Sequence, residues 1–296
     1  TKHLINDYFT MGDGAMKTAA VKLNLEGVLS HRLDNVCKKL ESLGITPCFF
    51  DKEYSGGEYK SYDEQTLLEA CDIVIALGGD GTILHAARLA ALANKPVLGI
   101  NNGTLGFMAG LEADELDLLD RLKTGDYITD RRMMLEINVK SADVSHKYYC
   151  LNDAVIARGD MSRIIDCSVS FGARTEMEYR CDGVIVATPT GSTAYSLSAG
   201  GPVLDPSINS ILLTPVCAHS FYARPLVLSP DISVSIQTAT KSGGKAVLTV
   251  DGELGVELKS DDIVEIGRSD DYCANLIKLK NESFMDVLYN KMIDRK

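Results

Sequence analysis

Several features that would direct a chain to a membrane or to an oxidising compartment are missing from this sequence. No apolar run approaches the roughly 18 residues that a membrane-spanning helix needs, and residues 1–15 lack the apolar core of a signal peptide. The eight cysteines contain no Cys-x-x-Cys pair. We therefore expect buried free thiols in place of a metal or disulfide framework, and a reducing, cytoplasmic location.

Positive charge is also scarce. The chain has 30 Lys and Arg against 41 Asp and Glu, which gives a formal net charge of −11. Such a field repels DNA, RNA and anionic lipid surfaces, so we expect neither a nucleic-acid partner nor a membrane partner. A phosphate-bearing ligand would have to be held by local donors, because the overall field does not attract it.

The composition is that of a globular protein. Apolar residues make up 45% of the chain and charged residues 24%, which excludes a disordered or fibrous protein. A length of 296 residues exceeds the usual size of a single core, so two domains are expected. The sequence contains no internal repeat and no low-complexity segment.

The first part of the chain, residues 16–124, alternates short apolar runs with helical patterns. This alternation is typical of βαβ units around a parallel sheet and predicts an α/β N-terminal domain. Strands are expected at 18–25, 45–50, 71–79 and 95–101, and helices at 31–44, 83–94 and 113–124. Between residues 50 and 71 the sequence indicates a polar loop rich in glycine.

The second part, residues 125–275, changes to period-two alternation in short runs. This pattern predicts an antiparallel, β-rich, sandwich-like C-terminal domain. The final stretch, residues 282–293, has apolar residues at helical spacing, and we expect it to return to the first domain, which residues 276–296 then complete. The expected strands of the second domain are 134–140, 147–157, 166–172, 182–189, 232–238, 246–252 and 262–268.

The sharpest local motif is Gly78-Gly79-Asp80-Gly81-Thr82, between a predicted strand and a predicted helix. Glycines allow positive φ and a close approach of a ligand, and the amides of a helix N-terminus attract phosphate. A carboxylate at Asp80 repels phosphate, so it indicates a base or a magnesium contact that faces a reacting hydroxyl. The alternative is a strand-to-helix turn in which the aspartate is only an N-cap. The candidate phosphate-binding residues for the donor are Gly78, Gly79, Gly81 and Thr82.

A second motif, rich in glycine, serine and threonine, occupies Asp182 to Pro202. Its hydroxyls and loop amides could bind a ribose, a pyrophosphate and an amide, while Tyr195 stacks on a base. The alternative is a polar linker, or an N-cap followed by a short helix. The common nucleotide motifs G-x-x-x-x-G-K-[ST] and G-x-G-x-x-G are absent, and the sequence shows no histidine–carboxylate metal cluster.

The run from Gly78 to Thr82 resembles the signature shared by NAD kinases, diacylglycerol and sphingosine lipid kinases and, less closely, phosphofructokinases. By itself it indicates phosphoryl transfer and leaves the acceptor open. The stretch 182–202 resembles the glycine-rich signature of NAD kinases of bacterial type, and the stretches 99–110, 150–159 and 215–228 are similar to further motifs of that family. The resemblance therefore covers nearly everything from Cys71 to Gly252.

The resemblance implies a kinase that phosphorylates the 2′-hydroxyl of the adenosine ribose of NAD to give NADP. ATP or polyphosphate would be the donor, Mg²⁺ would arrive with the ATP, and Asp80 would be the general base. A homodimer or homotetramer is also implied. The implied NAD-binding residues are Asp80, Gly81, His85, Asn152, Asp153, Arg163, Arg180, Asp182, Thr193, Ala194, Tyr195, Ser196, Leu197 and Ser198, with His219 and Glu253 as further candidates.

The sequence departs from the family pattern at two positions. Asp153 stands where the family usually has glutamate, one methylene longer, and Ala218 replaces a proline before His219. Two other functions remain open. A lipid kinase would need an apolar cleft or a basic patch, for which the loop 188–201 is too polar, and a non-catalytic dinucleotide-binding regulator would have no need of Asp80.

Overall fold

The chain consists of two compact units. A computed structural model describes residues 16–23, 30–51, 58–101, 106–141, 144–159, 164–172, 175–220, 222–239 and 245–293. Unit 1 comprises Thr1–Arg131 and Ala274–Lys296, and unit 2 comprises Arg132–Cys273. Residues 1–15, which by their sequence lack the apolar core of a signal peptide, lie outside the described residues.

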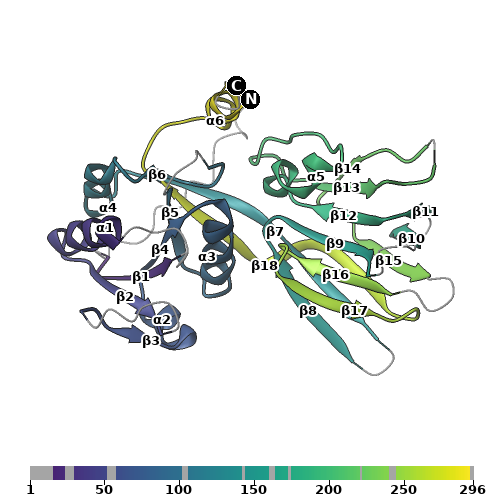
Figure 1. Cartoon of the computed structure of the whole chain (residues 1–296), viewed down its shortest axis with the longest axis horizontal. Helices are drawn as coiled ribbons and strands as arrows, with labels where there is room; N and C mark the ends of the chain where they lie inside the picture. Colours follow the sequence, from purple (N-terminus) through teal and green to yellow (C-terminus); the bar gives the residue numbers. More distant parts are fainter. Residues whose placement is uncertain are drawn as a thin grey trace. The chain divides into compact units, whose positions relative to one another are not determined.

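Unit 1 is built on a parallel sheet with helices on both sides (Figure 1). The strand order is β3-β2-β1-β4-β5, and the end of β18 pairs in parallel with β5. The strands are β1 (Thr18–Leu23), β2 (Thr46–Phe50), β3 (Ser61–Tyr62), β4 (Ile73–Gly78), β5 (Pro96–Asn101), β6 (Leu111–Glu112) and the end of β18 (Ile263–Lys278). The helices are α1 (Ser30–Ser42), α2 (Glu64–Ala70), α3 (Asp80–Leu92), η1 (Leu116–Leu119), α4 (Asp120–Thr124) and α6 (Phe284–Ile293).

Helices can cover both faces of this sheet because its strands are apolar along their whole length. Alternate residues of β4, Ile73, Ile75 and Leu77, share one buried cluster with α1 and α4. On the other face Gly99 of β5 lies against Ile83 of α3. Figure 1 shows α3 on the opposite side of β4 and β5 from α1 and α4. The position of α3 on the sheet thus depends on small residues beneath it.

The prediction of a loop between residues 50 and 71 is wrong over α2. Asp63 caps this helix, since its side chain accepts a hydrogen bond from the Thr66 amide at 3.0 Å. Only two residues of the helix, Leu67 and Leu68, are buried, so the apolar pattern is too short to reveal it. The predicted helix at 113–124 is instead the short 3₁₀ helix η1 followed by α4, which ends at Gly125 with φ of 70°.

Unit 2 is a sandwich of two antiparallel sheets. One sheet has the order β14-β13-β12-β9-β16-β17, and the other contains β11-β10-β15-β18 together with β7 and β8. Alternate residues of both sheets form one core. The elements are β7 (Ile128–Lys140), β8 (Ser145–Cys150), β9 (Asp153–Arg158), β10 (Ile165–Phe171), β11 (Thr175–Cys181), β12 (Gly183–Ala187), η2 (Thr190–Thr193), α5 (Tyr195–Ser198), β13 (Ile211–Val216), β14 (Leu226–Leu228), β15 (Val234–Ala239), β16 (Ala246–Val250), β17 (Leu254–Leu258) and the start of β18.

The predicted fold class is confirmed: an α/β unit with a parallel sheet, a β-rich sandwich and a C-terminal helix that belongs to the first unit. Within the second unit the single strand predicted at 147–157 is two strands, β8 and β9, divided at Leu151 and Asn152. Strands β11, β13, β14 and β17 were not predicted. All eight cysteines are free thiols, as expected, and six are buried. None of the described helices has the length and apolar character needed to cross a bilayer.

The packing of α3 on β5 gives a first testable prediction. A Cβ atom on Gly99 would lie 2.7 to 3.0 Å from three side-chain atoms of Ile83, which is fully buried. We expect Gly99→Ala to lower the free energy of unfolding by about 1–3 kcal/mol, because the core cannot absorb the methyl group without displacing α3. Urea denaturation measures the change. Gly255→Ala is the matched control, since its Cβ would make an ordinary contact of 3.8 Å; an equal loss in both variants would contradict the packing argument.

Candidate functional site

The carboxylate of Asp80 lies where two neighbouring parallel strands end. Gly78, the last residue of β4, pairs with Asn101, the last residue of β5. Because the carboxyl ends of parallel strands meet at one edge of a sheet, the segments that follow them come together. The Asp80 carboxylate accepts hydrogen bonds from the backbone amides of Phe107 at 3.2 Å and Met108 at 3.3 Å.

Asp80 is not the N-cap of α3. Gly79 holds that position with an extended backbone, φ −85° and ψ −177°, and makes no side-chain capping bond. The alternative in which the aspartate serves only as an N-cap is therefore wrong. The Asp80 side chain is 40% exposed, and the ammonium of Lys291 lies 3.2 Å from its Oδ2. A charged, partly exposed carboxylate thus stands at the start of the helix.

The three glycines around Asp80 do not adopt positive φ, so that part of the prediction is wrong. Gly78 is required for packing, since a Cβ would lie 2.5 Å from Thr82 Oγ1 and 2.8 Å from Thr82 Cβ. Gly79 and Gly81 differ, because a Cβ on either would meet no atom within 4 Å. The folded chain therefore leaves open space beside both residues. Thr82 and His85 follow along α3 and are half-buried.

In unit 2 the predicted residues Asn152 and Asp153 belong to the turn Leu151–Asp153, which leads from β8 into the first residue of β9. The carboxylate of Asp251 holds this turn: it accepts hydrogen bonds from the backbone amides of Leu151 at 3.0 Å, Asn152 at 2.8 Å and Asp153 at 3.2 Å. The amide of Asp251 in turn donates to the carbonyl of Asp153 at 2.9 Å. Three donors on one carboxylate fix the conformation of the turn.

The serine- and threonine-rich segment packs directly on this turn. The Thr188 amide donates to the carbonyl of Asn152 at 2.9 Å, and the Thr188 hydroxyl donates to the carbonyl of Leu151 at 2.5 Å. Gly191 approaches the backbone of Asn152 so closely that a Cβ would lie 2.6 Å from its carbonyl carbon and 2.8 Å from its Cα. The structure thus brings two separately predicted motifs into contact.

Most hydroxyls of this segment bond within the fold. The Ser192 hydroxyl donates to the carbonyl of Pro189 at 2.6 Å and accepts from the Leu204 amide at 2.9 Å. Thr190 Oγ1 accepts from the buried guanidinium of Arg132 at 3.1 Å. The hydroxyls of Thr193 and Ser196 contact the carbonyl of Thr190 and the hydroxyl of Thr214, respectively. The segment folds into the short helices η2 and α5, as the alternative interpretation expected.

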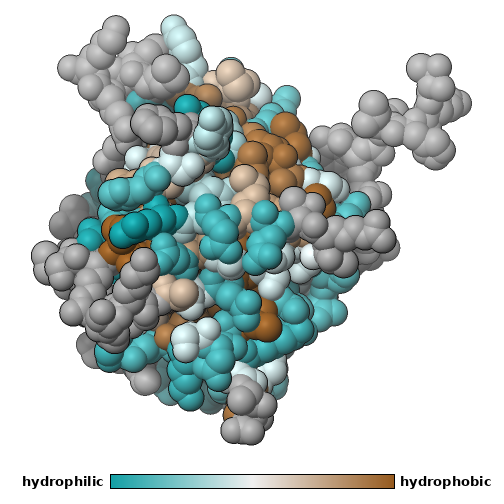
Figure 2. All heavy atoms as spheres, turned by 90° about the vertical axis from the view of Figure 1, so that its right-hand side faces the viewer, coloured by the Kyte–Doolittle hydropathy of each residue, from teal (hydrophilic) through white to brown (hydrophobic). Residues whose placement is uncertain are grey.

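The remaining predicted residues of this segment are more exposed. Tyr195 is 47% exposed, Leu197 and Ser198 are exposed, and Ala194 is partly buried. Figure 2 shows one face of the molecule, on which hydrophobic residues (brown) gather in small groups between hydrophilic ones (teal). Tyr195 and Leu197 are 47% and 41% exposed, whereas Ser196 is fully buried.

A third group of predicted residues lies at the opposite end of β9 and β12. Asp182 precedes β12, and its carboxylate pairs with Arg158 Nε at 3.2 Å. The exposed Arg180 precedes it, and its carbonyl accepts from the His219 amide at 2.8 Å. Strands rise about 3.3 Å per residue, so roughly 20 Å separate Asp182 from Thr188.

Two further predicted residues do not belong to this group. Glu253 is exposed in the turn between β16 and β17, and Arg163 lies outside the described residues.

Asp153 is a buried acid with an unusual pKa. The residue is 5% exposed, and burial together with the nearby charge of Asp251 raises its pKa from 3.8 to about 7. Asp251 accepts three amide hydrogen bonds that favour its charged form, and that charge is the second cause of the raised pKa of Asp153. Near neutral pH Asp153 can therefore donate a hydrogen bond as well as accept one.

Two residues of these surroundings were missed by the sequence analysis. Asp251 had a weak signal, because an Asp-Gly pair directly after an apolar strand indicates a turn. Lys291 had none, since a lysine on a terminal helix is ordinary. Both act over long separations along the chain, 99 residues from Asp251 to Asn152 and 211 from Lys291 to Asp80.

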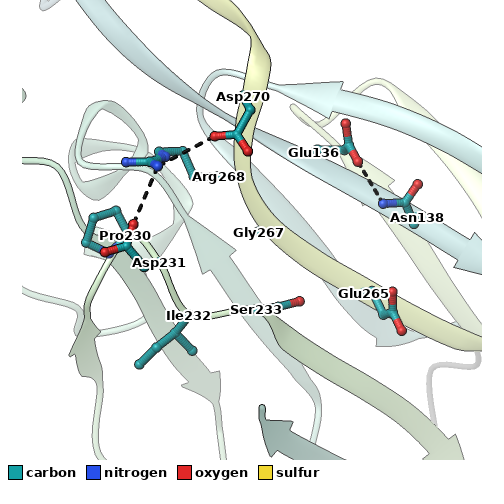
Figure 3. A pocket seen from close by; sticks show the side chains of 10 residues that line it. All are labelled: Glu136, Asn138, Pro230, Asp231, Ile232, Ser233, Glu265, Gly267, Arg268 and Asp270. Carbon is teal, nitrogen blue, oxygen red and sulfur yellow. Dashed lines mark hydrogen bonds and ion pairs between the residues drawn. The ribbon is translucent and has the colours of Figure 1, made fainter.

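A separate hollow in unit 2 contains none of the predicted site residues. It has a volume of about 340 Å³ and is bordered by Pro230 to Ser233, by residues of β18 and by Glu136 and Asn138 of β7 (Figure 3). Arg268 is paired there with Asp231 at 3.4 Å and Asp270 at 3.5 Å. The surplus of carboxylates makes this hollow unfavourable for phosphate.

Comparisons with known proteins indicate the same family for both units. Residues 35–127 match the ATP-NAD kinase N-terminal domain, and residues 151–279 match the ATP-NAD kinase C-terminal domain. The NAD kinase of Caldanaerobacter subterraneus subsp. tengcongensis is 44% identical over 226 residues, which are 76% of this chain and 79% of that protein. The NAD kinase of Carboxydothermus hydrogenoformans is 45% identical over 239 residues, 79% and 83% of the two chains. That of Citrifermentans bemidjiense is 35% identical over 272 residues, 91% and 90%.

Two solved structures share the fold. Yeast NADH kinase complexed with NADH superposes with a TM-score of 0.83 at 22% identity, over 95% of this chain and 88% of that one. An NAD kinase from Archaeoglobus fulgidus in complex with ATP gives a TM-score of 0.72 at 24% identity, over 93% and 98%. At these identities the likeness concerns the arrangement of the elements.

The contact between Gly191 and Asn152 gives a second prediction. We expect Gly191→Ala to separate the two segments and to lower the free energy of unfolding by about 1–3 kcal/mol, because a backbone cannot yield as a flexible side chain does. Ligand binding to unit 2 should weaken as well. Calorimetric unfolding and dinucleotide titration measure both effects. The control is again Gly255→Ala, and an unchanged variant would show that the contact is relaxed in solution.

The protonation of Asp153 gives a third prediction. Because its pKa is raised in the folded state, its contribution to stability is full below about pH 4 and is lost as the pH rises through about 7. Asp153→Asn mimics the protonated acid, so the variant should gain stability relative to the parent between these pH values, by up to about 4 kcal/mol. Urea titrations at pH 5 and 8 measure the difference. Asp270→Asn, which removes an exposed charge, should show no such trend; a parallel trend would contradict the assignment.

Proposed function

This chain belongs to the NAD kinase family, and we propose that it transfers the terminal phosphoryl group of ATP or polyphosphate to the 2′-hydroxyl of the adenosine ribose of NAD, giving NADP. The observation that carries the proposal is the carboxylate of Asp80. It is charged, partly exposed and oriented by two backbone amides, and it takes no part in capping α3. These are the properties that a general base needs.

The chemistry proposed for Asp80 is a single proton transfer coupled to phosphoryl transfer. Asp80 accepts the proton of the 2′-hydroxyl while the hydroxyl oxygen forms a bond to the terminal phosphorus of the donor. The bond from that phosphorus to its bridging oxygen breaks, and the leaving phosphate takes the electron pair. Asp80 then releases the proton to water. General-base assistance accounts for about 10²–10⁴-fold in rate, and positioning of the two substrates supplies the remainder.

The donor phosphates are assigned to the start of α3. The helix has 13 residues, and its first amides carry the positive end of the helix dipole. Gly79 and Gly81 leave open space where a Cβ would otherwise stand, which supports a ligand held close to the backbone there. Local donors of this kind suit an acidic chain of net charge −11.

The dinucleotide is assigned to unit 2, with its two ends at the two ends of β9 and β12. The turn Asn152-Asp153 and the exposed Tyr195 would contact the adenosine, and Asp182 the nicotinamide end. The separation of roughly 20 Å along the strands suits an extended molecule with two recognised ends. Protonated Asp153 offers a donor to a ribose oxygen, which compensates in part for its shorter side chain relative to glutamate.

Magnesium enters this proposal only as a companion of the donor. Among the described residues no three His, Cys, Asp or Glu side chains lie close enough to hold a metal ion, so a site built by the protein alone does not fit. An ion that arrives with ATP would be held by phosphate oxygens and water.

The competing functions are less well supported. A lipid kinase would share the run Gly78–Thr82 but not the sequence matches that extend through unit 2. A regulator without catalysis would not need an oriented carboxylate at Asp80. A cytoplasmic location and assembly into a homodimer or homotetramer stay predictions from the resemblance.

The test is an assay with NAD, magnesium and either ATP or polyphosphate, in which NADP is detected by a dehydrogenase specific for it. We expect turnover with at least one donor. Asp80→Asn should reduce kcat by about 10²–10⁴-fold and leave the dissociation constant of NAD nearly unchanged, because the amide keeps the size of the carboxylate but cannot take the proton.

The control variant is Asp72→Asn at the other end of β4. Its carboxylate accepts from the backbone amides of Lys17 at 2.7 Å and Thr18 at 2.9 Å, so its replacement affects folding only. Equal losses of NAD binding and turnover in Asp80→Asn would contradict the assignment of Asp80 as the general base. An absence of NADP with every donor would refute the proposed function.

A further inference from the structure

The C-terminal helix α6 supplies a charged partner to Asp80. The ammonium of Lys291, in the last turn of α6, donates to Asp80 Oδ2 at 3.2 Å. The Lys291 side chain is 19% exposed, so this pair is less screened by solvent than an ordinary surface ion pair. All of these residues belong to unit 1.

The position of Lys291 is fixed by a second contact with the same segment. Its ammonium lies 3.8 Å from the centroid of the Phe107 ring, a cation–π contact. Phe284 lies seven residues earlier, two helical turns away on the same face of α6, and its ring centroid is 6.2 Å from that of Phe107. The amide of Phe107 itself donates to Asp80. One face of α6 therefore holds both Asp80 and the residue that orients it.

The Asp80 carboxylate can accept more hydrogen bonds than the described residues donate to it. An ionised carboxylate has about four acceptor positions. Among the described residues, the amides of Phe107 and Met108 and the ammonium of Lys291 occupy three. Gly106 lies against Asp80 Oδ1 so closely that a Cβ there would collide with it. The carboxylate is thus confined from several directions, and the donors of the part of the chain that the structure describes use three of its acceptor positions.

We propose that Lys291 is a positioning residue for phosphoryl transfer, which acts by fixing the orientation of the Asp80 carboxylate. This inference rests on the proposed role of Asp80 as the base. Without the ammonium, each carboxylate oxygen keeps one amide donor, at 3.2 Å on Oδ2 and 3.3 Å on Oδ1. The charged donor on Oδ2 is lost, and the carboxylate gains freedom to rotate about its last bond, a torsion with broad preferences. A misplacement of about 1 Å at a reacting group can cost about 10²-fold in rate.

The variant that tests the inference is Lys291→Met, which keeps the length and apolar stem of the side chain and removes the charge. We expect kcat to fall by about 10- to 100-fold, with the KM values for NAD and ATP changed much less. Lys291→Arg restores a cation over Phe107 and should recover most of the lost kcat. A purely structural role would lower stability without this separation of kcat from KM.

The matched control is Lys280→Met. Lys280 precedes α6 and pairs with Glu115 at 2.8 Å, with similar exposure, in the same unit. Loss of this pair should lower the thermal stability about as much as Lys291→Met does and leave kcat unchanged. Equal kinetic effects in both lysine variants would mean that α6 only needs to be docked, and would overturn the proposal.

A double-mutant cycle separates this inference from the proposed function. If Lys291 acts through Asp80, Lys291→Met should cause no further loss in the residual turnover of Asp80→Asn. Additive losses of kcat would overturn the positioning role of Lys291 but would not contradict the proposed kinase activity. If the parent protein makes no NADP with any donor, the proposed function falls, and this inference falls with it.

Discussion

The pairing of β4 with β5 is the constraint on which the surroundings of Asp80 depend. Because the two parallel strands end in register, at Gly78 and Asn101, the segments that follow them must share one edge of the sheet. One segment provides the carboxylate and the other its amide donors. The small residue Gly99 lets α3 lie flat on the strands, and the helix thereby presents its first turn at that edge.

In unit 2 the candidate residues Asn152 and Asp153 are held in place by contacts to the backbone. The Asp251 carboxylate shapes the turn Leu151–Asp153, and Gly191 lets the following segment lie against it. The many serine and threonine hydroxyls of that segment bond to its own carbonyls and neighbours. These hydroxyls therefore stabilise the fold of the segment itself, whereas Tyr195 is 47% exposed.

The net charge of the protein does not by itself favour an anionic ligand. With a net charge of −11 the chain does not attract phosphate from a distance, and the cation next to Asp80 is already paired with it. The donors at the start of α3 are neutral amides, whose dipoles act only at short range. In the proposed site, recognition of phosphate would then depend on a close fit more than on long-range attraction. Gly79 and Gly81, which packing does not require, agree with such a close approach.

The sequence by itself determined the fold class and the chemical type of the site, because both follow from local patterns: strand and helix periodicity, and the runs Gly78–Thr82 and Asp182–Pro202. Of the four strands of unit 2 that were not predicted, β11, β14 and β17 stand at the edges of their sheets, where pairing with a neighbour stabilises a strand whose own pattern is weak. Only the tertiary structure decided that Asp80 is not a cap, that Ser196 is buried, and that Asp251 and Lys291 contact the candidate residues. Those contacts join positions 99 and 211 residues apart, and their geometry exists only once the chain has folded around them.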